Sequence, residues 1–141
     1  MPRGNIHMTY YLCYGLPLAD RSLDRRVDTL RLEGQGRLDG WKLAFTREGG
    51  LPNLVQAEGA KTWGCLYLVE KGKLEALDKE EPGAVRHEGK VYFEGHQEDC
   101  VFYAYPAAAG RPGKEFVANF RSVYEQASLP QAQIEQALAA K

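Results

Sequence analysis

Two short segments of the sequence combine residue types that could bind or transform a small polar molecule. The first is Tyr14-Gly15-Leu16-Pro17-Leu18, where an aromatic run stops at a glycine and turns. Exposed backbone N–H groups at such a strand end can form a nest for an anion, although an ordinary tight turn has the same signature. The second is Leu77-Asp78-Lys79-Glu80-Glu81-Pro82, whose neighbouring carboxylates point about 100° apart around a helix axis. One carboxylate can therefore face inward while another is solvated, although charged helix ends usually face solvent.

Other catalytic arrangements do not occur in the sequence. The serines lie in helical or capping contexts without a nucleophile elbow, which argues against a serine hydrolase. The three histidines lie far apart, and the three cysteines form no close pair, so we expect no metal site. Gly34, Gly36 and Gly40 precede a strand and do not have the spacing of a dinucleotide loop. We interpret them as turn and bulge glycines and expect no cofactor.

Composition and charge limit the partners. The 141 residues are 44% hydrophobic and 26% charged, as in an ordinary globular domain. The formal net charge is −1 with both signs interspersed, which gives no reason to expect nucleic acid or an anionic membrane as a partner. The longest apolar runs are far shorter than the ~20 residues of a spanning helix. A small polar ligand is the partner that these features favour.

Cysteine usage and the N-terminus favour a cytoplasmic protein. Cys13, Cys65 and Cys100 are widely spaced in apolar, strand-like runs, so we expect three buried free thiols. The first residues lack the basic stretch and apolar core of a secretory signal. Because His7-Met8 resembles a cloning junction, we expect residues 1–8 to be a tag or disordered and residues 9–141 to form a single domain.

The candidate segments must be positioned by strands and helices that follow each other without a regular β-α-β alternation. Aromatic and β-branched runs predict strands, and apolar residues at helical spacing predict helices. The expected strands are 9–14, 41–45, 53–55, 62–69, 85–93 and 100–105, the last two forming a hairpin across polar residues 94–99. The expected helices are 20–30, one from about residue 74 to Pro82, 116–127, and one that begins at Pro130. This order favours an α+β fold with five or six strands.

Several motifs, taken in order, resemble the γ-glutamylcyclotransferase-like family. A strand that runs into a Tyr-Gly-Ser-Asn-Leu-like loop matches 11–18, and a Gly-Tyr/Trp-x-Leu-x-Phe strand matches 40–45. Trp63-Gly64-Cys65-Leu66-Tyr67 matches a Trp-Gly-x-x-Tyr strand, and Leu77-Asp78-Lys79-Glu80-Glu81 matches Leu-Asp-x-x-Glu. An aromatic strand at 101–105 and Leu129-Pro130 complete the series, which extends from Thr9 to about Leu138.

The resemblance implies a small mixed β-barrel flanked by helices, with the Tyr-Gly loop and the acid of the Leu-Asp-x-x-Glu motif facing one cavity. Members release 5-oxoproline from a γ-glutamyl amine or peptide without a metal or cofactor, by attack of the substrate's own α-amine. Glu81 is then the general acid/base, a role that partial burial would support by raising its pKa. Substrate binding falls to Tyr14, Gly15, Leu16, Pro17 and Leu18, together with Tyr103 and Tyr105.

The sequence departs from the family pattern in this loop, and two alternatives stay open. Leu16 and Pro17 replace the Ser-Asn pair, which removes two polar side chains and, at Pro17, a backbone N–H. A catalytically impaired module that binds a small ligand in the same pocket is the first alternative. In the second, the amphipathic C-terminal helices form a homodimer or another partner surface.

Overall fold

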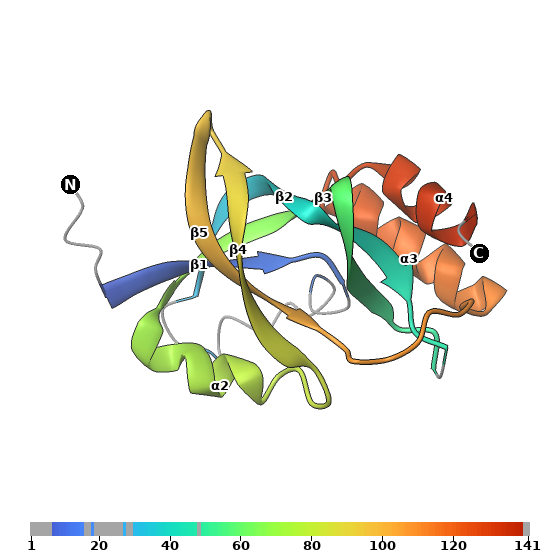
Figure 1. The fold of residues 1–141 in the computed structure, drawn as a ribbon, viewed down its shortest axis with the longest axis horizontal. Helices are drawn as coiled ribbons and strands as arrows, with labels where there is room; N and C mark the ends of the chain where they lie inside the picture. The colour runs from blue at the N-terminus through green and yellow to red at the C-terminus, as the bar shows by residue number, and fades with distance from the viewer. Residues whose placement is uncertain (1–6, 16–17, 19–26, 28–29, 48, 140–141) are drawn as a thin grey trace.

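The computed structural model of the protein describes residues 7–15, 18, 27, 30–47 and 49–139. Its strands are β1 (Met8–Cys13), β2 (Arg31–Phe45), β3 (Pro52–Glu70), β4 (Val85–Phe93) and β5 (His96–Ala104). They form a closed barrel in the order β1-β3-β2-β4-β5 (Figure 1). Only β1 and β5 pair in parallel; the other pairs are antiparallel. The predicted α+β fold with a mixed barrel flanked by helices is confirmed.

The helices lie at two places on this barrel. A 3-10 turn (Lys71–Lys73) and α2 (Leu74–Asp78) connect β3 to β4. The helices α3 (Lys114–Gln126) and α4 (Gln131–Ala139) lie together at the opposite end of the barrel from α2 (Figure 1). The predicted C-terminal helices are therefore confirmed, whereas the helix expected at 20–30 lies largely outside the described residues. No helix in the described part of the chain is long and apolar enough to cross a membrane.

Strands β2 and β3 form one long hairpin where the sequence predicted shorter pieces. The segments expected at 53–55 and 62–69 belong to a single 19-residue strand. The hairpin accommodates irregular pairing through register shifts beside Gly34 and Gly40, whose φ angles of 152° and 89° few other residues adopt. These two glycines lie at bulges, as expected, but the prediction that they precede a strand was wrong, because they lie inside β2. Their presence inside the pattern is the reason that a continuous strand looks interrupted in the sequence.

The turn between β4 and β5 is shorter than the sequence predicted. Phe93 pairs with His96, so only Glu94 and Gly95 connect the strands, and β5 begins within the polar segment 94–99. Both connecting residues have positive φ, as the favoured two-residue hairpin turns require. Polar side chains at 96–99 fit a strand because this end of β5 is mostly exposed.

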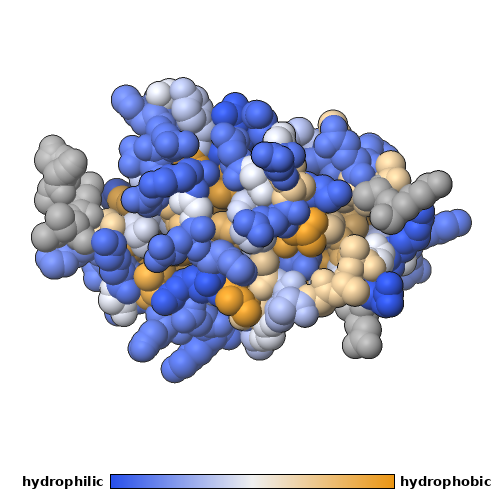
Figure 2. Space-filling view, in the orientation of Figure 1, coloured by the Kyte–Doolittle hydropathy of each residue, from blue (hydrophilic) through white to orange (hydrophobic). Residues whose placement is uncertain are grey.

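Two apolar clusters hold the helices on the barrel. The larger fills the barrel and continues beneath α3 and α4, with Leu12, Leu66, Phe102 and Phe120 among its buried members. The smaller lies against α2 and includes Tyr11, Val69, Leu77 and Tyr103. The visible surface in Figure 2 is mostly polar, with scattered apolar residues. Cys13, Cys65 and Cys100 are all buried and unpaired, which confirms that prediction.

Candidate active site

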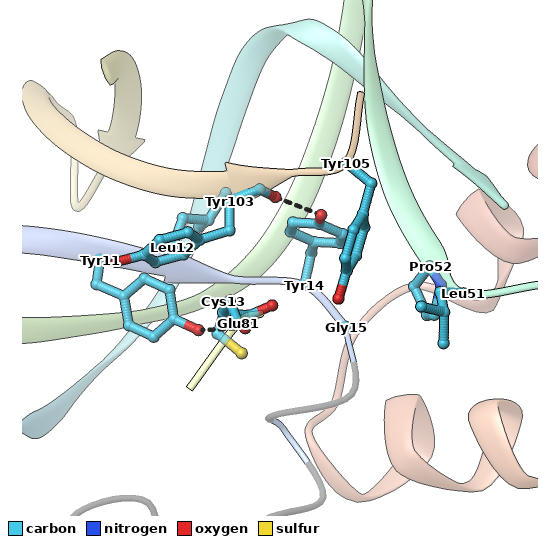
Figure 3. Close-up of a pocket in the computed structure, with 10 residues that line it drawn as sticks. All are labelled: Tyr11, Leu12, Cys13, Tyr14, Gly15, Leu51, Pro52, Glu81, Tyr103 and Tyr105. Carbon is cyan, nitrogen blue, oxygen red and sulfur yellow. Dashed lines mark hydrogen bonds between the residues drawn. The ribbon is translucent and has the colours of Figure 1, made fainter. Parts of the chain in front are cut away.

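A pocket at the end of β1 brings most of the predicted site residues together (Figure 3). Its lining comes from β1, β5, the turn after α2 and the residues at the start of β3. The lining residues are Tyr11, Leu12, Cys13, Tyr14, Gly15, Leu51, Pro52, Glu81, Tyr103 and Tyr105. Five of the predicted residues, from three separate parts of the chain, therefore line one pocket.

The loop after Gly15 fits the prediction only in part. Leu16 and Pro17 lie outside the described residues. Leu18 does not line the pocket; its half-buried apolar side chain packs against both core clusters instead. Packing of an apolar side chain away from a polar cavity is what the hydrophobic effect favours, so a role for Leu18 in direct substrate contact finds no support.

The position of Glu81 follows from the way α2 ends. Leu77, fully buried, anchors the helix in the smaller core cluster. The next turns continue through hydrogen bonds from the Glu81 N–H to the Asp78 carbonyl and from the Ala84 N–H to the Glu81 carbonyl, both 3.1 Å. The Asp78 carboxylate accepts a hydrogen bond from the Tyr103 hydroxyl at 2.6 Å and two from the Arg86 guanidinium, both at 3.0 Å. These contacts fix the turn against β4 and β5, so that Glu81 faces the end of β1.

Burial makes the Glu81 carboxyl suitable for proton transfer. Desolvation is the largest influence and raises the pKa to about 7, with a smaller contribution from the neighbouring Glu80. A long 3.4 Å hydrogen bond from the Tyr11 hydroxyl to Oε2 acts in the opposite direction and lowers the pKa (Figure 3). A carboxyl with a pKa near 7 is present in both protonation states at neutral pH, so it can accept a proton and later return it.

The end of β1 is held by hydroxyl groups on two sides. The Tyr14 hydroxyl donates to the Tyr103 carbonyl, and the Tyr14 carbonyl accepts the hydroxyl of Tyr124 from α3 at 2.9 Å. Gln133 of α4 in turn donates to the Tyr124 hydroxyl at 3.0 Å. The residue that precedes Gly15 is therefore fixed by both β5 and the C-terminal helices. The sequence does not reveal this contribution, because Tyr124 is only one apolar position of the amphipathic helix predicted at 116–127.

Tyr103 and Tyr105 both line the pocket, but their hydroxyl groups differ. The Tyr103 hydroxyl already donates to Asp78. The Tyr105 hydroxyl makes no hydrogen bond to any described residue, and its ring lies between Tyr14 and Pro52 in Figure 3. Desolvation and, to a smaller degree, the Glu81 charge raise the pKa of Tyr105, so this group remains a neutral donor at physiological pH. Tyr105 is thus the better placed of the two for a hydrogen bond to a ligand.

The cavity is small, and its described lining contains one charged residue. Its volume is about 20 Å³, enough for a single water molecule, so a larger ligand must displace some of the bordering side chains. Among the described residues that line it, Glu81 is the only charged one. Across the described part of the chain, no three His, Cys, Asp or Glu residues gather in a way that could hold a metal ion.

Solved structures resemble this fold over most of its length. A structure described as gamma-glutamyl cyclotransferase is 22% identical, with a TM-score of 0.76, and the match covers 95% of this chain and 88% of that one. An uncharacterized protein from Homo sapiens is 23% identical, with a TM-score of 0.75 and coverage of 96% and 89%. An AIG2-like protein from Mus musculus is 23% identical, with a TM-score of 0.59 and coverage of 73% and 80%. At these identities the likeness shows the fold alone.

The family assignment comes from the sequence match. No curated protein matches this chain at a significant level. The family model described as "Gamma-glutamyl cyclotransferase, AIG2-like" matches residues 11–120, from β1 into α3. This range includes every described residue that lines the pocket. The chain therefore belongs to the gamma-glutamyl cyclotransferase, AIG2-like family.

Proposed function

We propose that this protein is an enzyme that releases 5-oxoproline from a γ-glutamyl amine or peptide. The observation that carries the proposal is the Glu81 carboxyl, whose pKa burial raises to about 7 in a pocket beside Gly15. Family membership supports a cyclotransferase reaction. The pocket geometry supports Glu81 as the group that moves the proton.

In the proposed reaction, Glu81 first removes a proton from the α-ammonium group of the substrate. The freed amine nitrogen attacks the γ-carbonyl carbon, so that a new C–N bond closes the five-membered ring. The original γ-amide C–N bond then breaks as Glu81 returns the proton to the leaving nitrogen. The ring nitrogen also loses its second proton, which the departing amine takes up. The products are 5-oxoproline and the amine as an ammonium ion, and no water is consumed. Proton transfer of this kind contributes about 10²–10⁴-fold to the rate.

The developing oxyanion needs hydrogen-bond donors, and backbone N–H groups at the end of β1 are the candidates. The Gly15 N–H is the first candidate donor, because Gly15 lines the pocket together with Glu81. The N–H of Leu16 is the next candidate donor, whereas Pro17 has none. The Tyr105 hydroxyl is a further donor for substrate.

The test is a survey of γ-glutamyl amines and γ-glutamyl peptides for 5-oxoproline release, detected by chromatography and mass. We expect wild-type protein to release 5-oxoproline from at least one of them, and Glu81→Gln to be slower on the same substrate. Absence of release from the whole set, in folded protein, would contradict the proposal.

The Leu16-Pro17 pair supports one alternative, a binding module with impaired catalysis. Loss of one oxyanion donor costs about 2.7–4 kcal/mol of transition-state stabilisation, which can reduce turnover below detection. Binding of 5-oxoproline to the wild-type protein without any turnover would favour this alternative. Replacement of Leu16-Pro17 by Ser-Asn would then be expected to create activity.

A further inference from the structure

Asn53 is a buried polar residue beside the pocket, and both ends of its side-chain amide are used. Only 1% of the Asn53 surface is exposed to solvent. The Nδ2 group donates to the Tyr105 carbonyl at 3.0 Å, and Oδ1 accepts the Tyr105 N–H at 2.7 Å. Burial of an amide without such partners would cost about 1–3 kcal/mol, so the pairing explains how β3 tolerates this side chain.

Tyr105 needs this pairing because it lies just beyond the end of a strand. The ladder between β4 and β5 ends at the pair of Val85 and Ala104, so Tyr105 has passed the last ladder pair. The amide of Asn53 pairs with both backbone groups of Tyr105, as a neighbouring strand would. The Tyr105 carbonyl also accepts the Ala107 N–H at 2.8 Å, whereas its N–H donates to Asn53. Tyr105 is thereby held where the chain leaves β5, and like Pro52 it lines the cavity.

We infer that Asn53 is a positioning residue, which fixes the Tyr105 backbone so that the Tyr105 hydroxyl can bind the substrate. The inference rests on the proposed function for its substrate, and on the two hydrogen bonds for its geometry. Both bonds hold the main chain, so they fix the point from which the Tyr105 side chain reaches the cavity.

The kinetic test is a double-mutant cycle with Asn53→Ala and Tyr105→Phe. Each single variant should raise KM for an active γ-glutamyl substrate about 3- to 10-fold with little change in kcat, the size expected from one neutral hydrogen bond. The double variant should match Tyr105→Phe alone, because Asn53 acts through the hydroxyl that this variant lacks. A double variant whose rise in KM equals the product of the two single rises would overturn the inference. An unchanged KM in Asn53→Ala would overturn it as well.

Two further variants separate positioning from general stability. Asn53→Asp keeps the side-chain shape and the acceptor for the Tyr105 N–H, so it should fold and raise KM in the same direction. Thr62→Val is the matched control, because the Thr62 hydroxyl is also buried in β3 and donates to the Trp41 backbone carbonyl at 2.8 Å. Thr62 does not line the pocket. The variant should therefore lower stability without a change in KM. A KM rise in Thr62→Val equal to that in Asn53→Ala would assign both effects to stability.

A substrate-free measurement decides the role of Asn53 even if the proposed function fails. The titratable groups that face Tyr105 are Glu81 and Tyr14. In protein labelled at the tyrosine ζ carbon, the NMR signal of Tyr105 should follow the ionisation of Glu81 near pH 7. The size of this pH-dependent change in the Tyr105 signal should fall by about half or more in Asn53→Ala, because the electrostatic coupling between Glu81 and Tyr105 weakens with distance. It should persist in Thr62→Val. The same amplitude in wild type and Asn53→Ala would refute the positioning role.

Discussion

Replacement of Glu81 by glutamine should make the protein more stable at neutral pH while it reduces turnover. Burial raises the pKa of Glu81 from an ordinary value of 4.5 to about 7 in the folded protein. The folded state therefore holds the proton more tightly than the unfolded state, and the wild type loses stability as the pH rises from about 4.5 through 7. A pKa change of this size corresponds to about 3 kcal/mol at most, and the partial exposure of the carboxyl reduces it to about 1–3 kcal/mol.

Glutamine keeps the size and the acceptor for the Tyr11 hydroxyl but does not ionise, so the variant avoids this loss. Urea unfolding should show no difference between Glu81→Gln and wild type at pH 4, and a variant more stable by about 1–3 kcal/mol at pH 8. Turnover at pH 7 should fall about 10²-fold or more. Glu125→Gln, at an exposed site on α3, is the control and should change neither turnover nor the wild-type pH dependence.

A stability difference that does not vary with pH would refute the burial argument. A large loss of stability in Glu81→Gln would instead make Glu81 a structural ion partner. Unchanged turnover in a folded variant would remove it as the proton carrier.

Three further predictions follow from individual contacts. Tyr11→Phe removes the hydroxyl that lowers the pKa of Glu81, so the acidic limb of the kcat/KM profile should move to higher pH; an unmoved limb would contradict this. Tyr124→Phe leaves the Tyr14 carbonyl without this donor and should cost about 1–3 kcal/mol in urea unfolding, whereas unchanged stability would mean that water replaces the hydroxyl. The three buried cysteines should react slowly with a thiol reagent at pH 8 and quickly in urea, because burial raises the pKa of two of these thiols to about 12; rapid labelling of all three in native protein would contradict their burial.

The parts of the fold that were predictable have local signals in the sequence. Dense aromatic and β-branched runs at 9–14 and 85–93 predicted strands, and apolar spacing at 116–127 predicted α3. The length of β3 was not predictable in this way. Residues 56–61 are polar or small and follow no strand pattern. Only Gln56 and Lys61 of this segment pair with β2, and the residues between them form an irregularity inside β3 that no local signal in the sequence predicts.

The candidate site was predictable as far as motifs and residue spacing reach. The motif order brought Glu81 and the Tyr14-Gly15 pair to one pocket. Spacing alone made Tyr103 and Tyr105 equivalent, because both point to one face of an extended chain. The structure distinguishes the two residues, because the Tyr103 hydroxyl donates to the Asp78 carboxylate and the Tyr105 hydroxyl does not.

The residues that support the site from outside the motifs had no local signal. Asn53 pairs with a backbone 52 residues away, and Gln133 pairs with the backbone of Trp63, 70 residues away. Asparagine and glutamine are common surface residues, so nothing in their sequence neighbourhood distinguishes these two as buried. Their role becomes visible only when the barrel closes and brings distant main-chain groups beside them.

The origin of the product's oxygen atoms tests the central proposal most directly. Wild-type protein is incubated with an active γ-glutamyl amine in water enriched in ¹⁸O, and the products are identified by mass. Attack by the substrate's own amine predicts 5-oxoproline without solvent oxygen, together with one equivalent of free amine. Glutamate that carries ¹⁸O would show hydrolysis, and an unreacted γ-glutamyl set would show no enzyme of this kind; either result would contradict intramolecular cyclisation.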